Sequence, residues 1–113
     1  MLAILAPGQG SQTPGFLAPW LELPEVAAQL HWYSEVVGRD LVALGTTGSA
    51  DDIRDTAACQ PLLVAAGLAA AHALLGLDER PRYYAGHSVG ELTASALSGM
   101  LSDEAALVIA RER

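Results

Sequence analysis

A serine between two glycines is the feature of this sequence with the clearest chemical meaning. Residues 85–91 read Ala-Gly-His-Ser-Val-Gly-Glu and contain the pattern Gly-x-Ser-x-Gly, with Ser88 at its centre. In enzymes this pattern forms a nucleophile elbow, a sharp and strained turn that projects the serine hydroxyl outward. Gly86 and Gly90 remove side chains where the flanking strand and helix nearly touch. We therefore predict that Ser88 is a nucleophile, although the same pattern also occurs by chance in inert turns.

The segments on either side of the serine are those that an elbow requires. Residues 82–85, Arg-Tyr-Tyr-Ala, favour a short strand because two of the four are β-favouring aromatics. A helix is predicted from Ser88 to about Ser98, ended by Gly99. The free N–H groups and the dipole at the start of that helix would face the place where negative charge develops.

A second glycine-rich loop lies near the start of the chain. Residues 1–6 are apolar and predict a buried strand, which runs into Pro-Gly-Gln-Gly-Ser-Gln at 7–12. Acyl transfer needs two backbone N–H donors for the oxyanion, one after the nucleophile and one after an early strand. We assign these donors to Val89 and Gln9. Alone, Gly-Gln-Gly is more typical of a simple turn.

Taken together, the two loops resemble those of malonyl-CoA:acyl-carrier-protein transacylases, most of all the discrete actinobacterial versions. Asp-Ile-Arg-Asp-Thr at 52–56 and Gln-Pro-Leu-Leu at 60–63 resemble the middle block of the same family, so the resemblance covers the whole chain. It implies the α/β class, with an α/β-hydrolase-like acyltransferase core in which helices flank a parallel sheet. Residues 1–113 would be the N-terminal third, part of the large acyltransferase domain with no internal boundary.

The same resemblance implies that the fold is incomplete within these residues. The family's ferredoxin-like subdomain and its general-base histidine would lie outside them, and His87 is not that base. The remainder would be either a continuation of the polypeptide or a second chain. We expect residues 1–113 alone to be inactive and poorly folded, because both strands would lack neighbours.

The activity implied by the resemblance is malonyl transfer from malonyl-CoA to the phosphopantetheine thiol of acyl carrier protein, in fatty acid or polyketide biosynthesis. The intermediate would be a malonyl ester of Ser88. Malonyl-CoA is then a substrate, the partner carries the phosphopantetheine, and no cofactor is permanently bound. Substrate contacts are assigned by the resemblance to Gln60, His87 and Arg113.

Arg113 is the residue expected to bind the malonyl carboxylate, because arginine can hold a carboxylate through two parallel hydrogen bonds. Arg111 is the competing candidate, and both could instead complement the end of a helix. Val89 follows the nucleophile where methylmalonyl-selective relatives tend to have glutamine, which favours malonyl. For Gln60, a helix cap or surface position is as good an interpretation as a site residue.

Two other functions share some of these features. A serine hydrolase, either patatin-like or an α/β-hydrolase lipase or esterase, also uses Gly-x-Ser-x-Gly. Glu91 and the Gly-Gln-Gly loop match transacylases better. The other alternative is an inactive fragment that only packs with a partner chain.

Composition excludes several further classes. A formal charge of −7 and a pI near 4.6 argue against nucleic-acid binding, which needs a basic stripe. Cys59 is the single cysteine, so no internal disulfide forms, and we expect an inert buried thiol. The three histidines show no metal-ligand spacing.

The start lacks the basic region of a signal peptide. The apolar run at 57–77 contains polar residues and a proline, which favours a buried helix over a membrane span and leaves the cytoplasm as the default location.

Helix boundaries follow from caps and glycines. The run 24–37, ended by Gly38, places one apolar face at helical spacing. Shorter helices are predicted at 39–44, ended by Gly45, and at 50–55, opened by Ser49. A central helix should begin at Gln60 or Pro61 and close at Gly76, and a last helix should occupy 103–113, opened by Ser102. The face of the first helix consists of Val26, Leu30, Tyr33 and Val37.

Overall fold

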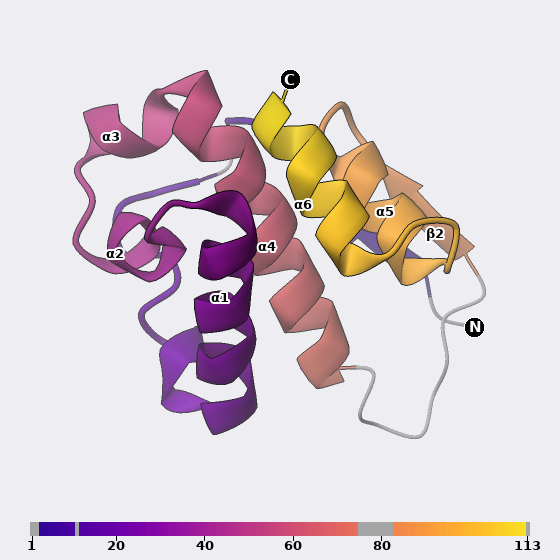
Figure 1. Ribbon diagram of the computed structural model, residues 1–113, viewed down its shortest axis with the longest axis horizontal. Helices are drawn as coiled ribbons and strands as arrows, with labels where there is room; N and C mark the ends of the chain where they lie inside the picture. Colours follow the sequence, from indigo (N-terminus) through magenta and orange to yellow (C-terminus); the bar gives the residue numbers. More distant parts are fainter. Residues whose placement is uncertain (1–2, 11, 75–82, 113) are drawn as a thin grey trace.

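A computed structural model describes residues 3–10, 12–74 and 83–112. The elements along the chain are β1 (Ala3–Ala6), η1 (Trp20–Glu22), α1 (Pro24–Val37), α2 (Leu41–Thr46), α3 (Ala50–Arg54), α4 (Thr56–Leu74), β2 (Tyr83–Gly86), α5 (Gly90–Leu97) and α6 (Asp103–Glu112). In Figure 1 the sheet lies behind α5 and α6, α1 and α4 cross the centre, and α2 and α3 lie at the far side from the sheet. The expected α/β arrangement, a parallel sheet flanked by helices, is therefore present.

The two strands pair in parallel with a register that pairs Ala3 with Tyr83 and Ala6 with Gly86. Parallel strands cannot be joined by a tight hairpin, and here the connection contains helices α1 to α4. Because the strands run in the same direction, their carboxyl ends lie at one edge of the sheet. The two glycine-rich loops leave the sheet at that edge, although they are far apart in the sequence.

The core forms around α4, which packs against α1, α3, α5 and α6. Its apolar side chains are buried nearly all round, as predicted for a central helix, and include Leu62, Val64, Ala65 and Leu68. By length and composition α4 could cross a membrane, but 56% of its apolar stretch is buried inside the molecule. That burial supports the interpretation of α4 as a core helix.

Helices α1 and α3 form where the capping residues and glycines of the sequence predict them. Gly38 follows α1 with φ 80°, the left-handed conformation that glycine adopts without strain, and the four predicted face residues are buried. Before α3, the Ser49 hydroxyl accepts a hydrogen bond from the Asp52 N–H at 3.1 Å. The Asp52 carboxylate accepts one from the Ser49 N–H at 3.0 Å. This reciprocal capping box fixes the start of α3.

The prediction for α2 was wrong by two residues, and Gly45 does not end it. Helix α2 begins after Asp40, whose carboxylate accepts from the Ala43 N–H at 3.0 Å, and it runs through Gly45 to Thr46. A Cβ on Gly45 would lie 2.7 Å from Leu17 Cγ. This glycine is therefore needed for the close approach of a distant leucine, which local sequence does not reveal.

The start of α4 was also predicted incorrectly. The helix begins at Thr56, so Pro61 lies inside it and not in its first turn. The carbonyl of Asp55 accepts from the Cys59 N–H at 2.7 Å and begins the helix four residues early. Ala57, whose carbonyl Pro61 cannot satisfy, is an exposed residue, which lowers the cost of the internal proline.

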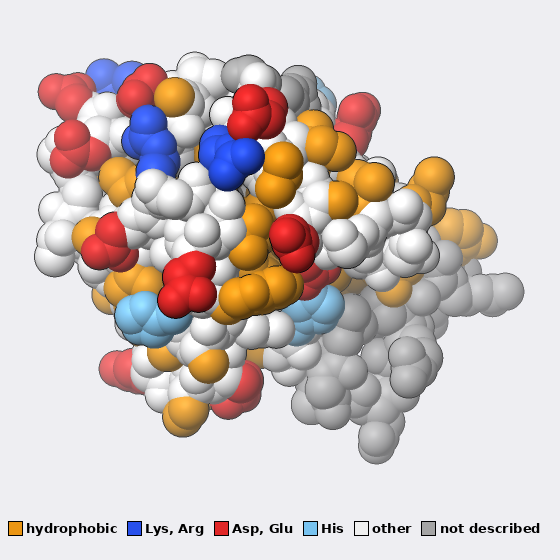
Figure 2. All heavy atoms as spheres, viewed as in Figure 1, with side chains coloured by type: hydrophobic (Ala, Val, Ile, Leu, Met, Phe, Trp, Pro, Cys, Tyr) orange, Lys and Arg blue, Asp and Glu red, His pale blue; other side chains and the backbone are white. Residues whose placement is uncertain are grey.

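Helix α6 begins as expected, because the Ser102 hydroxyl accepts a hydrogen bond from the Ala105 N–H at 3.0 Å. Figure 2 shows acidic and basic side chains interleaved on the helical face of the molecule. Among the residues coloured on that face, the arginines form no continuous basic stripe. This distribution agrees with the acidic composition of the chain.

Candidate active site

Ser88 occupies the strained turn that the sequence predicts. Its φ is 57°, and within the described residues it is the only non-glycine residue with a positive φ. The left-handed conformation costs an L-residue roughly 1–2 kcal/mol. The turn is held in place by Val89, which is buried, while Ser88 itself is exposed. Ser88 is thus exposed on a turn whose backbone is held in place by the buried residue next to it.

Gly86 and Gly90 allow the strand and helix on either side of Ser88 to touch. A Cβ on Gly86 would overlap the carbonyl of Gly90, and a Cβ on Gly90 would overlap the carbonyl of Ala6. Any side chain at either position would push α5 away from the sheet. The spacing of the two glycines around the serine is therefore explained by backbone contact, as predicted.

The start of α5 differs from the prediction in a way that affects the site. The helix begins at Gly90 and not at Ser88, because the left-handed φ of Ser88 is incompatible with a helix. The N–H groups of Gly90, Glu91 and Leu92 donate to carbonyls three residues earlier, at 3.0 Å each. The Val89 N–H makes no hydrogen bond to any residue that the structure describes. Of these four N–H groups, only that of Val89 is available to a substrate oxygen.

The loop after β1 lies directly against this turn. The His87 N–H donates to the Ala6 carbonyl at 3.1 Å, which extends the strand pairing by one bond. A Cβ on Gly8 would lie 2.7 Å from the His87 carbonyl oxygen and 3.4 Å from Ser88 Cβ. The tertiary structure therefore brings together the two glycine-rich segments that the sequence analysis assigned to one site.

Gln9 lies in the loop after β1, and its role as an oxyanion donor stays a prediction. Its backbone N–H makes no hydrogen bond within the described parts of the chain. Its side-chain amide points to α3, where Nε2 donates to the Arg54 carbonyl at 3.1 Å. The backbone of Gln9 is thus open to a ligand, while its side chain anchors the loop.

Gln12 belongs to the loop motif, but the sequence did not predict a role for it. Its Oε1 accepts from the Gly10 N–H at 2.8 Å, and its Nε2 donates to the Ile53 carbonyl at 3.2 Å. A glutamine in a glycine-rich loop is a signal for such bridging, because its amide both donates and accepts. The partner in α3 could not be identified from sequence.

Gln60 lies in the second turn of α4, so the interpretation as a helix cap is wrong. The residue is half-buried, and its Oε1 is buried without a hydrogen-bond partner among the described residues. A buried amide oxygen without a partner costs roughly 1–3 kcal/mol. This cost is consistent with an acceptor kept for a ligand or another part of the protein.

Arg111 lies near the end of α6, and its side chain makes two hydrogen bonds. Arg111 Nη1 donates to the Val36 carbonyl at 3.2 Å, and its Nε donates to Glu112 at 2.9 Å. The Arg111 side chain is therefore engaged at the end of α1. Arg113 lies outside the described residues, so its predicted role stays a prediction.

Two histidines and the cysteine are the remaining side chains with possible chemical roles. His72 Nε2 lies 2.8 Å from an Asp103 carboxylate oxygen that also accepts from the Tyr33 hydroxyl at 2.8 Å. His87 is exposed beside the nucleophile turn. Cys59 is buried, and burial raises the pKa of its thiol. In the described part of the chain, no three side chains are grouped to hold a metal ion.

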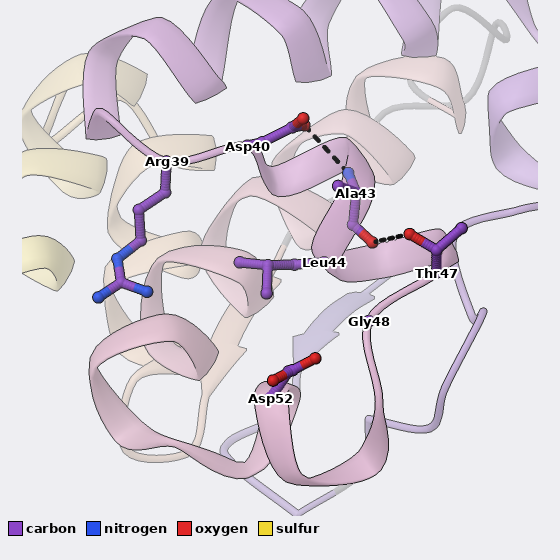
Figure 3. Close-up of a pocket in the computed structure, with 7 residues that line it drawn as sticks. All are labelled: Arg39, Asp40, Ala43, Leu44, Thr47, Gly48 and Asp52. Carbon is purple, nitrogen blue, oxygen red and sulfur yellow. Dashed lines mark hydrogen bonds between the residues drawn. The ribbon is translucent and has the colours of Figure 1, made fainter.

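A surface hollow away from Ser88 is shown in Figure 3 and lies between α2 and α3. Three of its polar side chains serve the helices themselves. Asp40 caps α2, the Thr47 hydroxyl donates to the Ala43 carbonyl at 3.3 Å, and Asp52 belongs to the capping box of α3. We find no nucleophile among its lining residues, so the site around Ser88 remains the candidate for catalysis.

The chain is similar in sequence to malonyl CoA-acyl carrier protein transacylases. No family model matches the chain. The malonyl CoA-acyl carrier protein transacylase of Mycobacterium tuberculosis H37Rv is 47% identical over 116 residues, which cover 100% of this chain and 38% of the relative. The Escherichia coli K12 protein of the same name is 36% identical over 101 residues, covering 88% of this chain and 33% of the relative.

Solved structures give the same result. The chain superposes on the crystal structure of the M. tuberculosis transacylase with a TM-score of 0.85 at 45% identity, covering 97% of this chain and 37% of that one. A malonyl-transacylase solved in complex with a type II polyketide synthase acyl-carrier protein gives 0.91 at 33% identity, covering 98% and 37%. The chain spans little more than a third of these relatives, and its similarity is to their N-terminal part.

Proposed function

We propose that this chain forms the nucleophile-bearing part of a malonyl-CoA:acyl-carrier-protein transacylase, an acyltransferase. The observation that carries the proposal is the contact between the two glycine-rich loops, with the exposed and strained Ser88 against Gly8. The similarity to the N-terminal part of transacylases over the whole chain supports the choice of reaction. The proposed location is the cytoplasm.

In the first half-reaction, the Ser88 hydroxyl oxygen attacks the thioester carbonyl of malonyl-CoA. Its proton passes to a general-base histidine supplied from outside the 113 residues. The carbonyl oxygen becomes an oxyanion, which the backbone N–H groups of Gln9 and Val89 stabilise. The tetrahedral intermediate collapses, the C–S bond breaks, the CoA thiol leaves with the proton, and a malonyl ester of Ser88 remains.

In the second half-reaction, the phosphopantetheine thiol of acyl carrier protein attacks the ester, and Ser88 regains its proton. Transfer rather than hydrolysis requires that this thiol compete with water. A relative solved with an acyl-carrier protein bound supports the choice of acceptor. We assign no permanently bound cofactor, since CoA enters and leaves as part of the substrate and product.

Three further residues are proposed to bind the substrate. Gln60 brings an amide oxygen that has no partner among the described residues to the second turn of α4, and His87 is exposed beside Ser88. Arg113 is proposed to pair with the free carboxylate that distinguishes malonyl from acetyl. The engagement of Arg111 with Val36 and Glu112 supports Arg113 over Arg111 for this role.

The proposal is tested by mapping the acyl group. The full-length gene product is incubated with malonyl-CoA, and the modified peptide is identified by mass spectrometry. We expect a malonyl adduct on Ser88 that is absent from Ser88→Ala and is discharged by the addition of acyl carrier protein. Acylation at another residue, or discharge to water at the same rate without carrier protein, would contradict the proposal.

A further inference from the structure

The last turn of α3 provides two backbone carbonyls that have no partner inside the helix. The four final carbonyls of any helix lack intrahelical donors, and α3 has only five residues. Two of its carbonyls are taken by side chains from the loop after β1, 41 and 45 residues away in sequence. Gln12 binds the Ile53 carbonyl at 3.2 Å, and Gln9 binds the Arg54 carbonyl at 3.1 Å.

Helix α3 is held in place by contacts at both its start and its buried face. The capping box fixes its first turn, and Ile53 is 2% exposed in the hydrophobic core. The loop is therefore tied to an element that the core holds in place. A loop anchored in this way keeps its backbone donors in a fixed direction.

The orientation of the Gln12 amide follows from its partners. The Gly10 N–H can only donate, so the atom facing it must be the carbonyl oxygen. The Ile53 carbonyl can only accept, so the atom facing it must be the amide nitrogen. The Gln12 side chain thus links Gly10 to α3 in one arrangement.

This link determines which backbone donor of the loop remains free. The Gly10 N–H is taken by Gln12 Oε1, whereas the Gln9 N–H has no partner in the described residues. We propose that the side chains of Gln9 and Gln12 are positioning residues, which hold the loop against α3 so that Gln9, and not Gly10, supplies the oxyanion donor. This inference rests on the proposed function.

The test compares variants of the full-length gene product. Gln12→Leu removes both hydrogen bonds at similar volume, and Gln12→Glu keeps the acceptor for Gly10 but loses the donor for Ile53. Gln9→Leu removes the anchor to Arg54 without changing its backbone N–H. Gln29→Leu in α1 is the matched control, because the Gln29 side chain makes no hydrogen bond to the described residues. The rate of Ser88 acylation, KM for malonyl-CoA and the melting temperature are measured for each.

A misplaced oxyanion donor weakens transition-state binding and leaves ground-state binding intact, so kcat should fall while KM stays close to wild type. Loss of one oxyanion donor costs about 10²–10³-fold in kcat, and we expect about 10- to 100-fold for the displaced donor of Gln12→Leu and Gln9→Leu. Gln12→Glu should fall between Gln12→Leu and the wild type, and it replaces Gln12→Leu if that variant does not fold.

Three outcomes separate the two proposals. A wild-type kcat in both Gln12 variants, with Ser88→Ala inactive, overturns the positioning role and leaves the proposed function standing. A kcat loss in Gln12→Leu and Gln9→Leu that is no larger than the loss in Gln29→Leu also overturns the positioning role. Undiminished acylation of Ser88→Ala would instead remove the proposed function, whatever the glutamine variants do.

Discussion

The N–H of His87 donates to the carbonyl of Ala6, and this bond of 3.1 Å joins the ends of two strands that are distant in the sequence. It lies one residue beyond the last strand pair, Ala6 with Gly86. The bond therefore sets the separation of the two loops that follow the strands. Gly8 can then lie against Ser88.

Gly8→Ala should damage the site by crowding it. The added Cβ would lie 2.7 Å from the His87 carbonyl and 3.0 Å from its Nδ1, so the two loops must separate. We expect a loss of about 1–3 kcal/mol in unfolding free energy and at least about a tenfold loss in acylation rate. Gly99→Ala is the control, since its φ of 90° causes strain but no described residue has an atom within 4 Å of the added Cβ. Normal acylation in Gly8→Ala would contradict the proposed contact.

Ser88→Gly and Ser88→Ala should both abolish acyl transfer but differ in stability. Glycine adopts the positive φ of residue 88 without strain, so Ser88→Gly should be about 1 kcal/mol more stable than Ser88→Ala. At Ser98, where φ is −79°, the same pair should show the opposite order. Denaturant unfolding of the four variants measures both differences. Equal stability of the two Ser88 variants would show that the turn is not strained.

Tyr33→Phe should change how stability depends on pH. Burial, followed by the hydrogen bond to Asp103 and the charge of that residue, raises the pKa of the Tyr33 phenol. Above about pH 10 the unfolded chain releases this proton while the folded protein keeps it. The stability that depends on the Tyr33 proton is therefore fully present below about pH 10. Above this pH, wild-type stability should fall by about 1.4 kcal/mol for each pH unit.

In Tyr33→Phe the part of this slope that Tyr33 causes should disappear, while the part from the buried Cys59 thiol stays. Stability near neutral pH should be lower by roughly 1–3 kcal/mol through loss of a hydrogen bond to a charged acceptor. Tyr83→Phe is the matched control, because the Tyr83 side chain is 58% exposed. Urea unfolding between pH 8 and 11 provides the measurement. An unchanged slope in Tyr33→Phe would assign the dependence to other groups.

Arg113→Ala should lower malonyl transfer steeply and leave acetyl transfer unchanged or higher, because the malonyl carboxylate loses its cation. We expect about 10²-fold or more for malonyl, the scale of a charged hydrogen-bonded pair. Arg111→Ala is the control, since the Arg111 side chain binds Val36 and Glu112. Initial rates with malonyl-CoA and acetyl-CoA decide the matter. Equal losses for both substrates, or lost selectivity in Arg111→Ala alone, would reject the assignment.

The isolated 113-residue chain should self-associate and show no transfer activity. Leu5 and Tyr83 on the two strands are 77% and 58% exposed, and both edges of the described sheet lack a neighbouring strand. Analytical ultracentrifugation should show oligomers that Leu5→Lys reduces. A monomeric, cooperatively melting and active chain would refute this expectation.

Much of the local structure was determined by the sequence alone. The end of α1 at Gly38, the capping box at Ser49 and the strained turn at Ser88 each depend on residues within a few positions of one another. A backbone conformation or a cap follows from such short-range chemistry. The candidate nucleophile and the two candidate oxyanion donors could therefore be named before the structure was known.

Only the tertiary structure decided the contacts between distant segments. Gly45 was predicted to end a helix, but it lies within α2 because Leu17 packs on it. Pro61 predicted a helix start at residue 60 or 61, but α4 begins at Thr56 and contains Pro61. The pairing of Gln9 and Gln12 with α3 joins residues more than 40 positions apart, and no local pattern specifies which carbonyls a glutamine will reach. Such contacts depend on how the whole chain packs, so the anchor of the proposed oxyanion loop could be identified only from the fold.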